Sequence, residues 1–342
     1  MEHAFLNASG LESAMSRAIE LAKLSPTHGE NPQVGAVLIN DAGEMVAEGF
    51  HRGAGTPHAE IDALSKVADA RGLTAVVTLE PCNHHGKTGP CAEALIAAGI
   101  KRVVFGSFDP GKQEGGGRLR LEAAGVEVIS DLKRAECDRI IAPWFVNKFK
   151  NRPYVVIKWA SSVDGRTAAA DGSSKWITGA AARDDVHSRR ADSQSILVGT
   201  NTVEIDNPEL TARKPDGSLF ANQPLRVIVG ERNLPNDARV FNDVAKTMQI
   251  KTHDVSKALS ELFELGIRQV FVEGGATLQS ALIRQKLADE FLIYLAPKLI
   301  GGPATAIGDL GVASIDQSIE LDFFETKQLG EDILLRAINK EN

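Results

Sequence analysis

A histidine, a glutamate and two cysteines in the first third of the chain have the types and spacing of a metal site. His58 and Glu60 are separated by one residue, Cys82 follows a proline, and Cys91 lies nine positions after Cys82. Imidazole and thiolate groups are preferred zinc ligands, and a catalytic zinc site keeps its fourth position open for water. Three ligands beside an uncoordinated carboxylate therefore predict a site where a metal lowers the pKa of a water molecule.

The expected secondary structure brings these groups to the ends of elements. We expect a helix over His58–Ala70, a strand over Thr74–Leu79 and a helix over Cys91–Ala98. Cys82 then comes just after the strand, and the second thiolate lies at a helix N-terminus, where the helix dipole favours it. Glu60 can point past the metal and serve as a general acid and base.

The His-x-Glu and Pro-Cys pattern resembles the signature of zinc-dependent deaminases. Many of these proteins have two residues between the cysteines, whereas eight intervene here. Loop 83–90 holds two histidines, a lysine and a threonine, which suit an anionic group of a substrate. Three alternatives stay open: the loop is an ordinary solvated loop, the zinc site is structural and has no catalytic role, or the residues bind no metal.

Composition and charge exclude several classes of protein. The chain has 342 residues, enough for two domains, and its 43% hydrophobic and 24% charged residues are typical of globular proteins. No run of about 20 apolar residues and no secretory signal is visible, which predicts a cytoplasmic protein without membrane contact. The net charge of −7 argues against nucleic-acid binding. Two of the three cysteines fall in the motif, which favours reduced thiols over disulfides.

Alternating apolar and amphipathic segments predict an α/β architecture in both halves of the chain. In residues 1–150, strands are expected at 34–39, 45–50, 74–79, 102–105 and 126–129, and helices at 9–24, 58–70, 91–98 and from Gly115. A charged helix over 132–150 is expected to connect the halves. In residues 151–342, strands are expected at 154–159, 196–198, 225–229, 269–272 and 291–295, and helices at 179–191, 256–265 and 276–287.

Longer motifs occur in both halves. The first half contains Asn31-Pro-Gln-Val-Gly35, Gly49-Phe-His51, Pro57-His-Ala-Glu60 and a polar stretch from Thr78 to Cys91. The second half contains Lys158-Trp-Ala160, Asp164-Gly-Arg166, Trp176-Ile-Thr178, Thr202, Asp206-Asn-Pro208, Leu210-Thr-Ala-Arg213 and Val272-Glu-Gly-Gly275. Together they resemble the RibD family of bifunctional riboflavin biosynthesis proteins. The resemblance implies a cytidine-deaminase-like three-layer domain over 1–150 and a dihydrofolate-reductase-like α/β domain over 151–342.

The resemblance also implies two reactions and two cofactors. The first domain would use Zn²⁺ to deaminate 2,5-diamino-6-ribosylamino-4(3H)-pyrimidinone 5′-phosphate by hydrolysis. The second would use NADPH to reduce the ribosyl group of the product to a ribityl chain. The partners implied are therefore small pyrimidine ribonucleotides, without nucleic acid or membrane, and a second copy of the chain in a homodimer or higher homo-oligomer.

Residue roles follow from the same resemblance. The metal ligands would be His58, Cys82 and Cys91, with Glu60 as the catalytic acid and base. Substrate contacts in the first domain would be Asn31, His51, His84 and Lys87. Cofactor contacts in the second would be Ala160, Trp176, Thr202, Asp206, Gly275, Ala276, Thr277, Leu278 and Gln279. Its substrate contacts would be Ser174, Arg190, Leu210, Arg213 and Glu273. Two further roles are hypotheses beyond the resemblance. Asp206 and, as a second choice, Lys158 are candidates for proton transfer because of their motif positions, and Arg232 is a candidate for the 2′-phosphate of NADPH because it follows the strand that ends near Gly230.

Read without the resemblance, the second half is ambiguous. No G-x-G-x-x-G pattern follows a strand, so a Rossmann site is not indicated. The Gly274-Gly275 pair suits either a phosphate at a helix N-terminus or a simple turn. Arg190 and Arg213 suit either a phosphate or surface salt bridges, and Trp176 could be a core residue.

Two other functions compete with the bifunctional enzyme. One is a nucleic-acid or nucleoside base deaminase with an appended nucleotide-binding domain, and the other is a binding protein that has lost its activity. An acidic chain with 5% aromatic residues disfavours the first. The presence of Glu60 and both thiolates disfavours the second. After Asp109-Pro110 the chain departs from the usual family sequence with Gly111-Lys-Gln-Glu, which leaves the packing of this loop undetermined.

Overall fold

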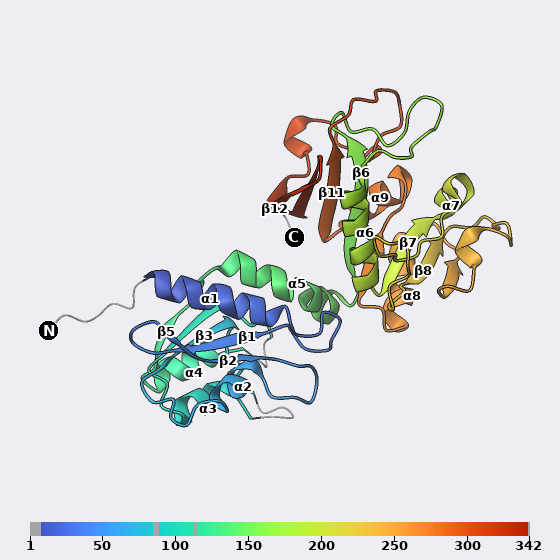
Figure 1. Ribbon diagram of the computed structural model, residues 1–342. Coiled ribbons are helices and arrows are strands. Elements are labelled where there is room, and N and C mark those ends of the chain that lie inside the picture. Colours follow the sequence, from blue (N-terminus) through green and yellow to red (C-terminus); the bar gives the residue numbers. More distant parts are fainter. Residues whose placement is uncertain (1–7, 85–88, 112–114, 341–342) are drawn as a thin grey trace. The chain divides into compact units, whose positions relative to one another are not determined.

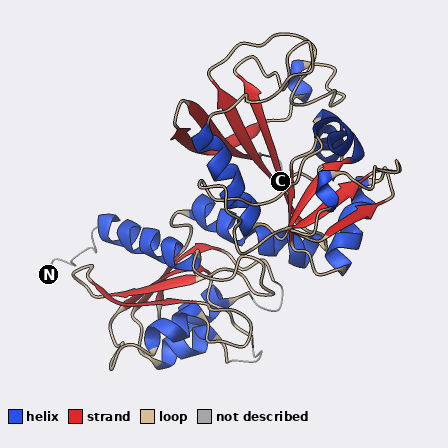
Figure 2. Ribbon diagram, turned by 45° about the vertical axis from the view of Figure 1, so that its right-hand side comes forward, coloured by secondary structure: helices blue, strands red, loops and turns tan. Residues whose placement is uncertain are grey.

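The computed structural model describes residues 8–84, 89–111 and 115–340. Contacts within the chain divide it into two compact units, Met1–Lys150 and Asn151–Asn342. Each unit contains one β-sheet with helices packed against it (Figures 1 and 2). None of the helices in the described residues is both long and apolar enough to cross a membrane.

The first unit is built on a five-stranded sheet in the order β2-β1-β3-β4-β5. Its strands are β1 (Gly35–Ile39), β2 (Met45–Phe50), β3 (Thr74–Leu79), β4 (Arg102–Ser107) and β5 (Glu127–Ile129). β1 runs antiparallel to both β2 and β3, whereas β3, β4 and β5 are parallel. The start of β1 and the carboxyl ends of β2, β3 and β4 therefore lie at the same edge of the sheet.

Helices cover both faces of this sheet and make three layers. Side chains alternate between the faces of a strand: Val37 packs with Met15 and Cys137, whereas Leu38 packs with Ala63 on the other side. One face is covered by α1 (Ala8–Ala22) and α5 (Arg134–Lys150), and the other by α2 (Ala59–Leu64), α3 (Cys91–Ala97) and α4 (Gly117–Ala123).

The helix expected to connect the two halves is an integral layer of the first unit. Cys137 of α5 is fully buried, and its Sγ lies 3.8 Å from Sδ of Met15 in α1. The helix expected over 58–70 is shorter than its sequence pattern suggests, because α2 ends at Leu64 and a turn follows.

The second unit contains an eight-stranded sheet in the order β12-β13-β11-β6-β10-β7-β8-β9. Its strands are β6 (Tyr154–Ser162), β7 (Ser195–Gly199), β8 (Leu225–Val229), β9 (Thr247–Ile250), β10 (Gln269–Val272), β11 (Glu290–Ala296), β12 (Leu321–Leu329) and β13 (Asp332–Asn339). The six strands from β11 to β9 are parallel, and β13 and β12 add an antiparallel edge.

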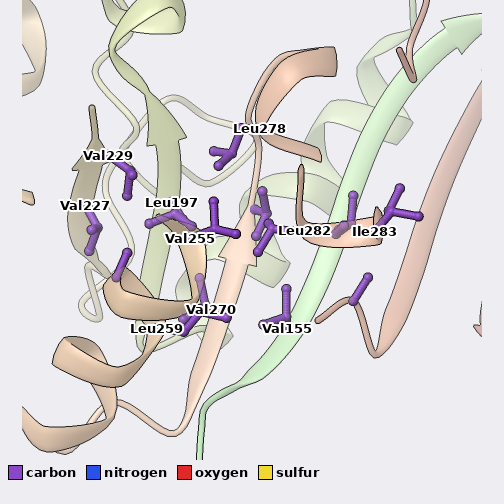
Figure 3. Packing of buried hydrophobic residues seen from close by; sticks show 14 of the residues in the cluster. Val155, Leu197, Val227, Val229, Val255, Leu259, Val270, Leu278, Leu282 and Ile283 are labelled. Carbon is purple, nitrogen blue, oxygen red and sulfur yellow. The ribbon is translucent and has the colours of Figure 1, made fainter. Parts of the chain in front are cut away.

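Buried aliphatic side chains hold this sheet to its helices. Leu259 and Leu282 pack in one cluster with Val155, Leu197 and Val270 from the central strands (Figure 3). The helices of the unit are α6 (Ala180–Asp192), α7 (Thr200–Asp206), α8 (Val255–Glu264) and α9 (Ala276–Arg284). The amphipathic pattern of α8 and α9 thus buries their apolar faces on the sheet, while the carboxyl ends of β6, β7 and β10 stay together at one edge.

Candidate functional sites

Segments distant in sequence meet at one edge of the first sheet. Asn31 precedes β1, His51 follows β2 and Cys82 follows β3. The backbone N–H of His51 donates to the carbonyl of Val34 at 3.0 Å, which fixes the end of β2 against the start of β1. The sheet topology therefore brings together the residues that the sequence motifs place at loop positions.

His58, Cys82 and Cys91 converge at this edge. Nδ1 of His58 lies 3.6 Å from Sγ of Cys82 and 3.3 Å from Sγ of Cys91. The three candidate ligand atoms all lie within 4.8 Å of one another. His58 precedes the first residue of α2 and Cys91 is the first residue of α3. One nitrogen and two sulfurs in this arrangement fit a zinc ion with an open fourth position.

Hydrogen bonding within this trio favours a thiolate at Cys82, whereas the bond with Cys82 and burial raise the pKa of Cys91. Bonds with the Cys91 thiol and with His58 lower the pKa of Cys82 to about 4, and the bond with Cys82 raises the pKa of His58. The backbone N–H of Cys91 also points to Sγ of Cys82 at 3.4 Å. Because zinc binds thiolates rather than thiols, the environment of Cys82 is suited to a metal ligand.

Glu60 is a buried carboxyl group beside these ligands. It lies in the first turn of α2 and is only 4% exposed. Burial raises the pKa of Glu60 to about 7, and the charge of Cys82 acts in the same direction. A carboxyl group with a pKa near neutrality can both accept and return a proton. Glu60 and His58 line one cavity of about 310 Å³.

The same cavity is lined by a fixed polar pair. Nδ1 of His51 lies 3.0 Å from the carbonyl of Pro57, and its Nε2 lies 2.9 Å from Nδ2 of Asn31. The carbonyl requires Nδ1–H, so Nε2 accepts a hydrogen bond from the Asn31 amide. Burial lowers the pKa of His51, which keeps the ring neutral. Both residues line the cavity, as does His84, whereas Lys87 lies outside the described residues.

The cavity also contains residues that the sequence reasoning missed. Trp144 and Lys148 of α5 line it, together with Glu80 and Asp109. Nε1 of Trp144 donates to the carbonyl of Glu30 at 3.1 Å. Trp144 and Lys148 are four residues apart and therefore lie on one helix face. This spacing is the sequence signal from which the pair could have been predicted.

The second unit has a larger cavity, of about 910 Å³, at the carboxyl ends of its central strands. Most residues expected at the reductase site line it: Lys158, Ala160, Ser174, Trp176, Thr202, Asp206, Arg190, Leu210, Arg213, Glu273, Gly275, Ala276 and Gln279. Trp176 is 64% exposed, so it is not a core residue. The ring of Trp176 instead carries the guanidinium of Arg183 at 4.7 Å from its centroid.

A buried cluster of charges forms the floor of this cavity. Arg190 donates from Nε and Nη2 to the two oxygens of Glu273, at 2.5 and 3.0 Å. Nζ of Lys158 lies 3.6 Å from Oε2 of the same carboxylate. Burial lowers the pKa of Lys158, against the opposing charge of Glu273. Burial would raise the pKa of Glu273, but the two cations lower it to about 2.

For four residues the geometry differs from the expected contact. Leu278 packs into the hydrophobic core (Figure 3), because the third residue of α9 faces the sheet, and exposed Thr277 is not among the residues that line the cavity. Arg190 does not offer its paired nitrogens to a phosphate, because Glu273 holds them and Thr211 accepts from Nη1 at 3.0 Å. Arg232 pairs with Glu204 at 2.8 Å and is likewise not among the lining residues.

Comparison with known proteins agrees with this division of the chain. Residues 8–107 match the family described as the cytidine and deoxycytidylate deaminase zinc-binding region, and residues 153–335 match the RibD C-terminal domain. The riboflavin biosynthesis protein RibD of Mycobacterium tuberculosis is 44% identical over 331 residues, which cover 96% of this chain and 97% of the relative. RibD of Escherichia coli is 36% identical, with 96% of this chain and 99% of the relative covered.

Solved structures show the same likeness over the full length. Acinetobacter baumannii RibD has a TM-score of 0.77 and 36% identity, covering 98% of this chain and 100% of the other. A diaminohydroxyphosphoribosylaminopyrimidine deaminase/5-amino-6-(5-phosphoribosylamino)uracil reductase from Thermotoga maritima has a TM-score of 0.78 and 34% identity, covering 97% and 99%. These matches confirm the expected fold class of a deaminase domain followed by a reductase domain.

Fold and site thus define a two-domain enzyme in which a zinc-binding deaminase domain precedes a reductase domain. The chain belongs to the RibD family of riboflavin biosynthesis proteins. A base deaminase with an unrelated appended domain is not favoured, because relatives match both halves together.

Proposed function

We propose that the first cavity deaminates 2,5-diamino-6-ribosylamino-4(3H)-pyrimidinone 5′-phosphate by hydrolysis. The proposal rests on the convergence of His58, Cys82 and Cys91 at a cavity that His58, Cys82 and buried Glu60 line. Zinc, when bound by the three ligands, supplies a Lewis acid that activates water. The cavity of about 310 Å³ is of a size for a single small heterocycle.

The residues of the chain supply proton transfer and orientation. Glu60 takes one proton from the attacking water and passes it to the ring nitrogen. It then carries the second proton, from the hydroxyl group formed on the ring carbon, to the leaving amine. Oxygen thereby replaces nitrogen on the ring carbon, and ammonia leaves. Asn31 and His51 are fixed to each other and to the backbone, so they can orient the pyrimidine without rearrangement.

We propose that the second cavity reduces the ribosyl group of the deaminated product with NADPH, which supplies a hydride. Lys158 and Asp206 are the candidates for the accompanying proton. Lys158 is supported by its place in the buried charge cluster, where burial lowers its pKa. Asp206 is supported by its place at the end of α7, on the cavity wall. Homo-oligomeric assembly stays a prediction from the family resemblance, and a cytoplasmic location stays a prediction from the sequence.

Asp206→Asn tests the assignment of the proton. The variant should slow NADPH oxidation and change its pH dependence, because an amide cannot donate a proton. An unchanged rate with an unchanged pH profile would remove Asp206 from the mechanism and leave Lys158 as the candidate.

A two-part assay tests both activities in the full-length protein. The protein is incubated with the diaminopyrimidine nucleotide, with and without NADPH, and both ammonia release and NADPH oxidation are followed. Glu60→Gln should lower ammonia release by about 10²- to 10⁴-fold, the usual contribution of a general acid and base. Reduction of the deaminated intermediate, supplied directly, should be unchanged. Glu12→Gln, an exposed change in α1, is the matched control.

This design can contradict the assignment of each activity independently of the other. Normal ammonia release by Glu60→Gln would contradict the role of Glu60. No NADPH oxidation by the wild-type protein with the deaminated intermediate would contradict the assignment of the second cavity.

A further inference from the structure

Two arginines share one carboxylate at the wall of the second cavity. Nη2 of Arg239 lies 2.6 Å from Oε1 of Glu209, and Arg213 pairs with Oε2 of the same residue. All three residues line the cavity of about 910 Å³. Arg213 was expected at the substrate site, whereas neither the motifs nor the spacing pointed to Arg239.

The backbone holds this pair of arginines in place. Arg239 begins the short 3-10 helix Arg239–Phe241, and its N–H donates to Oδ1 of Asn207 at 2.8 Å. Fully buried Arg226 donates from Nη1 to the carbonyl of Glu209 at 3.1 Å. Two segments that are about 30 residues apart are thus fixed to each other, so an anion at this wall would meet donors that are already ordered.

The charge balance at this wall favours an anion. Two guanidinium groups face one carboxylate, and Lys214 lines the cavity beside them. The side chains of Arg213 and Arg239 are 37% and 55% exposed, so incoming groups can reach them. Arg190, in contrast, has its paired nitrogens on Glu273. Arg213 and Arg239 are also paired with a carboxylate, but their side chains are more exposed than that of Arg190, which is 16% exposed. Recognition of a phosphate by guanidinium nitrogens is therefore assigned to Arg213 and Arg239.

We propose that Arg239 is a second phosphate-binding residue of the reductase site, acting with Arg213 on a phosphate monoester while Glu209 holds both guanidinium groups. The proposal rests on the assignment of the second cavity to the reductase reaction. A phosphate monoester has two sources in that reaction: the 5′-phosphate of the pyrimidine nucleotide and the 2′-phosphate of NADPH. The two sources share the same chemistry and are separated by experiment.

Arg239→Gln and Arg239→Lys in the full-length protein test the proposal. Reductase kinetics are measured with the deaminated nucleotide and its dephosphorylated counterpart, each with NADPH and with NADH. Calorimetric titration of the deaminated nucleotide without dinucleotide gives binding independently of turnover. Arg284→Gln is the control, since Arg284 is an exposed arginine of the same unit that donates to the carbonyl of Asp309. Wild-type ammonia release shows that the first unit of each variant is folded. A thermal unfolding scan shows whether the second unit is folded.

If the 5′-phosphate is the ligand, Arg239→Gln raises KM and Kd for the phosphorylated nucleotide by roughly 10- to 100-fold, as expected for losing hydrogen bonds to a charged group. The value of kcat is unchanged, because binding is lost equally in ground and transition states. The dephosphorylated substrate is unaffected, and Arg239→Lys recovers part of the loss.

If the 2′-phosphate is the ligand, KM rises for NADPH alone, while NADH and both nucleotides keep their wild-type values. This outcome also supports the phosphate site and identifies its source. The proposal is overturned if Arg239→Gln matches Arg284→Gln for every substrate, or if phosphorylated and dephosphorylated nucleotides weaken equally. Wild-type protein without reductase activity would instead contradict the function of the cavity itself.

Discussion

At the scale of single residues, Glu273 organises the charges of the second cavity. Its carboxylate faces two cations, and its side chain is only 8% exposed. The cations lower its pKa to about 2, from an ordinary value of 4.5. A folded-state pKa below the unfolded value contributes stability that is fully present above pH 4.5. That contribution is lost as the pH falls from 4.5 toward 2, because the unfolded chain then binds the proton first.

Glu273→Gln should strongly destabilise the second unit at pH 7. The change leaves Arg190 and Lys158 buried without a counter-charge, and breaking a buried pair in this way costs about 3–5 kcal/mol. The free energy of unfolding is measured by denaturant titration of the full chain between pH 7 and pH 3. The difference from wild type should shrink below pH 4.5.

The control for this change is an exposed ion pair. Glu320→Gln breaks the pair with Lys340, whose partner carboxylate is 67% exposed, and should cost less than about 1 kcal/mol. An equal cost for both variants, or a cost of Glu273→Gln that does not vary with pH, would contradict the role assigned to the buried cluster.

At the scale of elements, α5 joins the stability of the first unit to its cavity. The buried side of the helix places Cys137 against β4, where an added Cβ on Gly106 would lie 2.2 Å from Sγ of Cys137. The later turns of the same helix bring Trp144 and Lys148 to the cavity. A shift of the helix on the sheet would therefore move Trp144 and Lys148 and change substrate binding in the cavity.

Gly106→Ala should destabilise the first unit by about 1–3 kcal/mol, the usual cost of overpacking a core. It should also raise KM for the diaminopyrimidine nucleotide, since α5 must move outward. Thermal unfolding and ammonia release measure the two effects. Gly10→Ala in α1 is the control: its nearest new neighbour would be 3.7 Å away, so stability should stay the same or rise by up to about 1 kcal/mol. Equal stability of both variants would contradict the tight packing of α5.

Elements with a strong local pattern could be predicted from the sequence, and weakly patterned ones could not. β1 and β3 were visible because every residue in them is buried and the strands therefore read as apolar runs. α8 was visible because its buried residues recur with the helical period. One α-helix and three strands were missed, α7, β9, β12 and β13, as were two short 3-10 helices. α7 has seven residues, β9 has four, and β12 is largely exposed along its length, so these three show no clear period.

The candidate sites divide in the same way. The metal site could be predicted from residue spacing, because His58, Cys82 and Cys91 lie within one stretch of chain. Trp144 reaches the first cavity only because α5 packs across the sheet. Arg239 reaches the second only because a loop some 30 residues downstream folds back onto Glu209. Such contacts depend on tertiary packing, which leaves no local signal.

At the scale of the whole molecule, each of the two activities depends on a different structural unit. Each unit has its own sheet and hydrophobic clusters, and each cavity is lined by residues of one unit alone. In the described residues, the only group of histidine, cysteine and acidic side chains arranged to hold a metal ion is the His58 trio of the first unit. Loss of the metal should therefore act on one reaction.

Removing zinc with a strong chelator should abolish ammonia release and leave the reductase active. The three ligands lie at the end of β3 and at the starts of α2 and α3, so removal of the metal perturbs the first unit. The sheet of the second unit contains none of these ligands. Metal content, ammonia release and NADPH oxidation with the deaminated intermediate are measured on one sample, and Zn²⁺ is then added back. Ammonia release should return with about one zinc per chain, the stoichiometry of a three-ligand site. A parallel loss of both activities would show that the second unit depends on the metal, and full ammonia release without bound metal would contradict the zinc site.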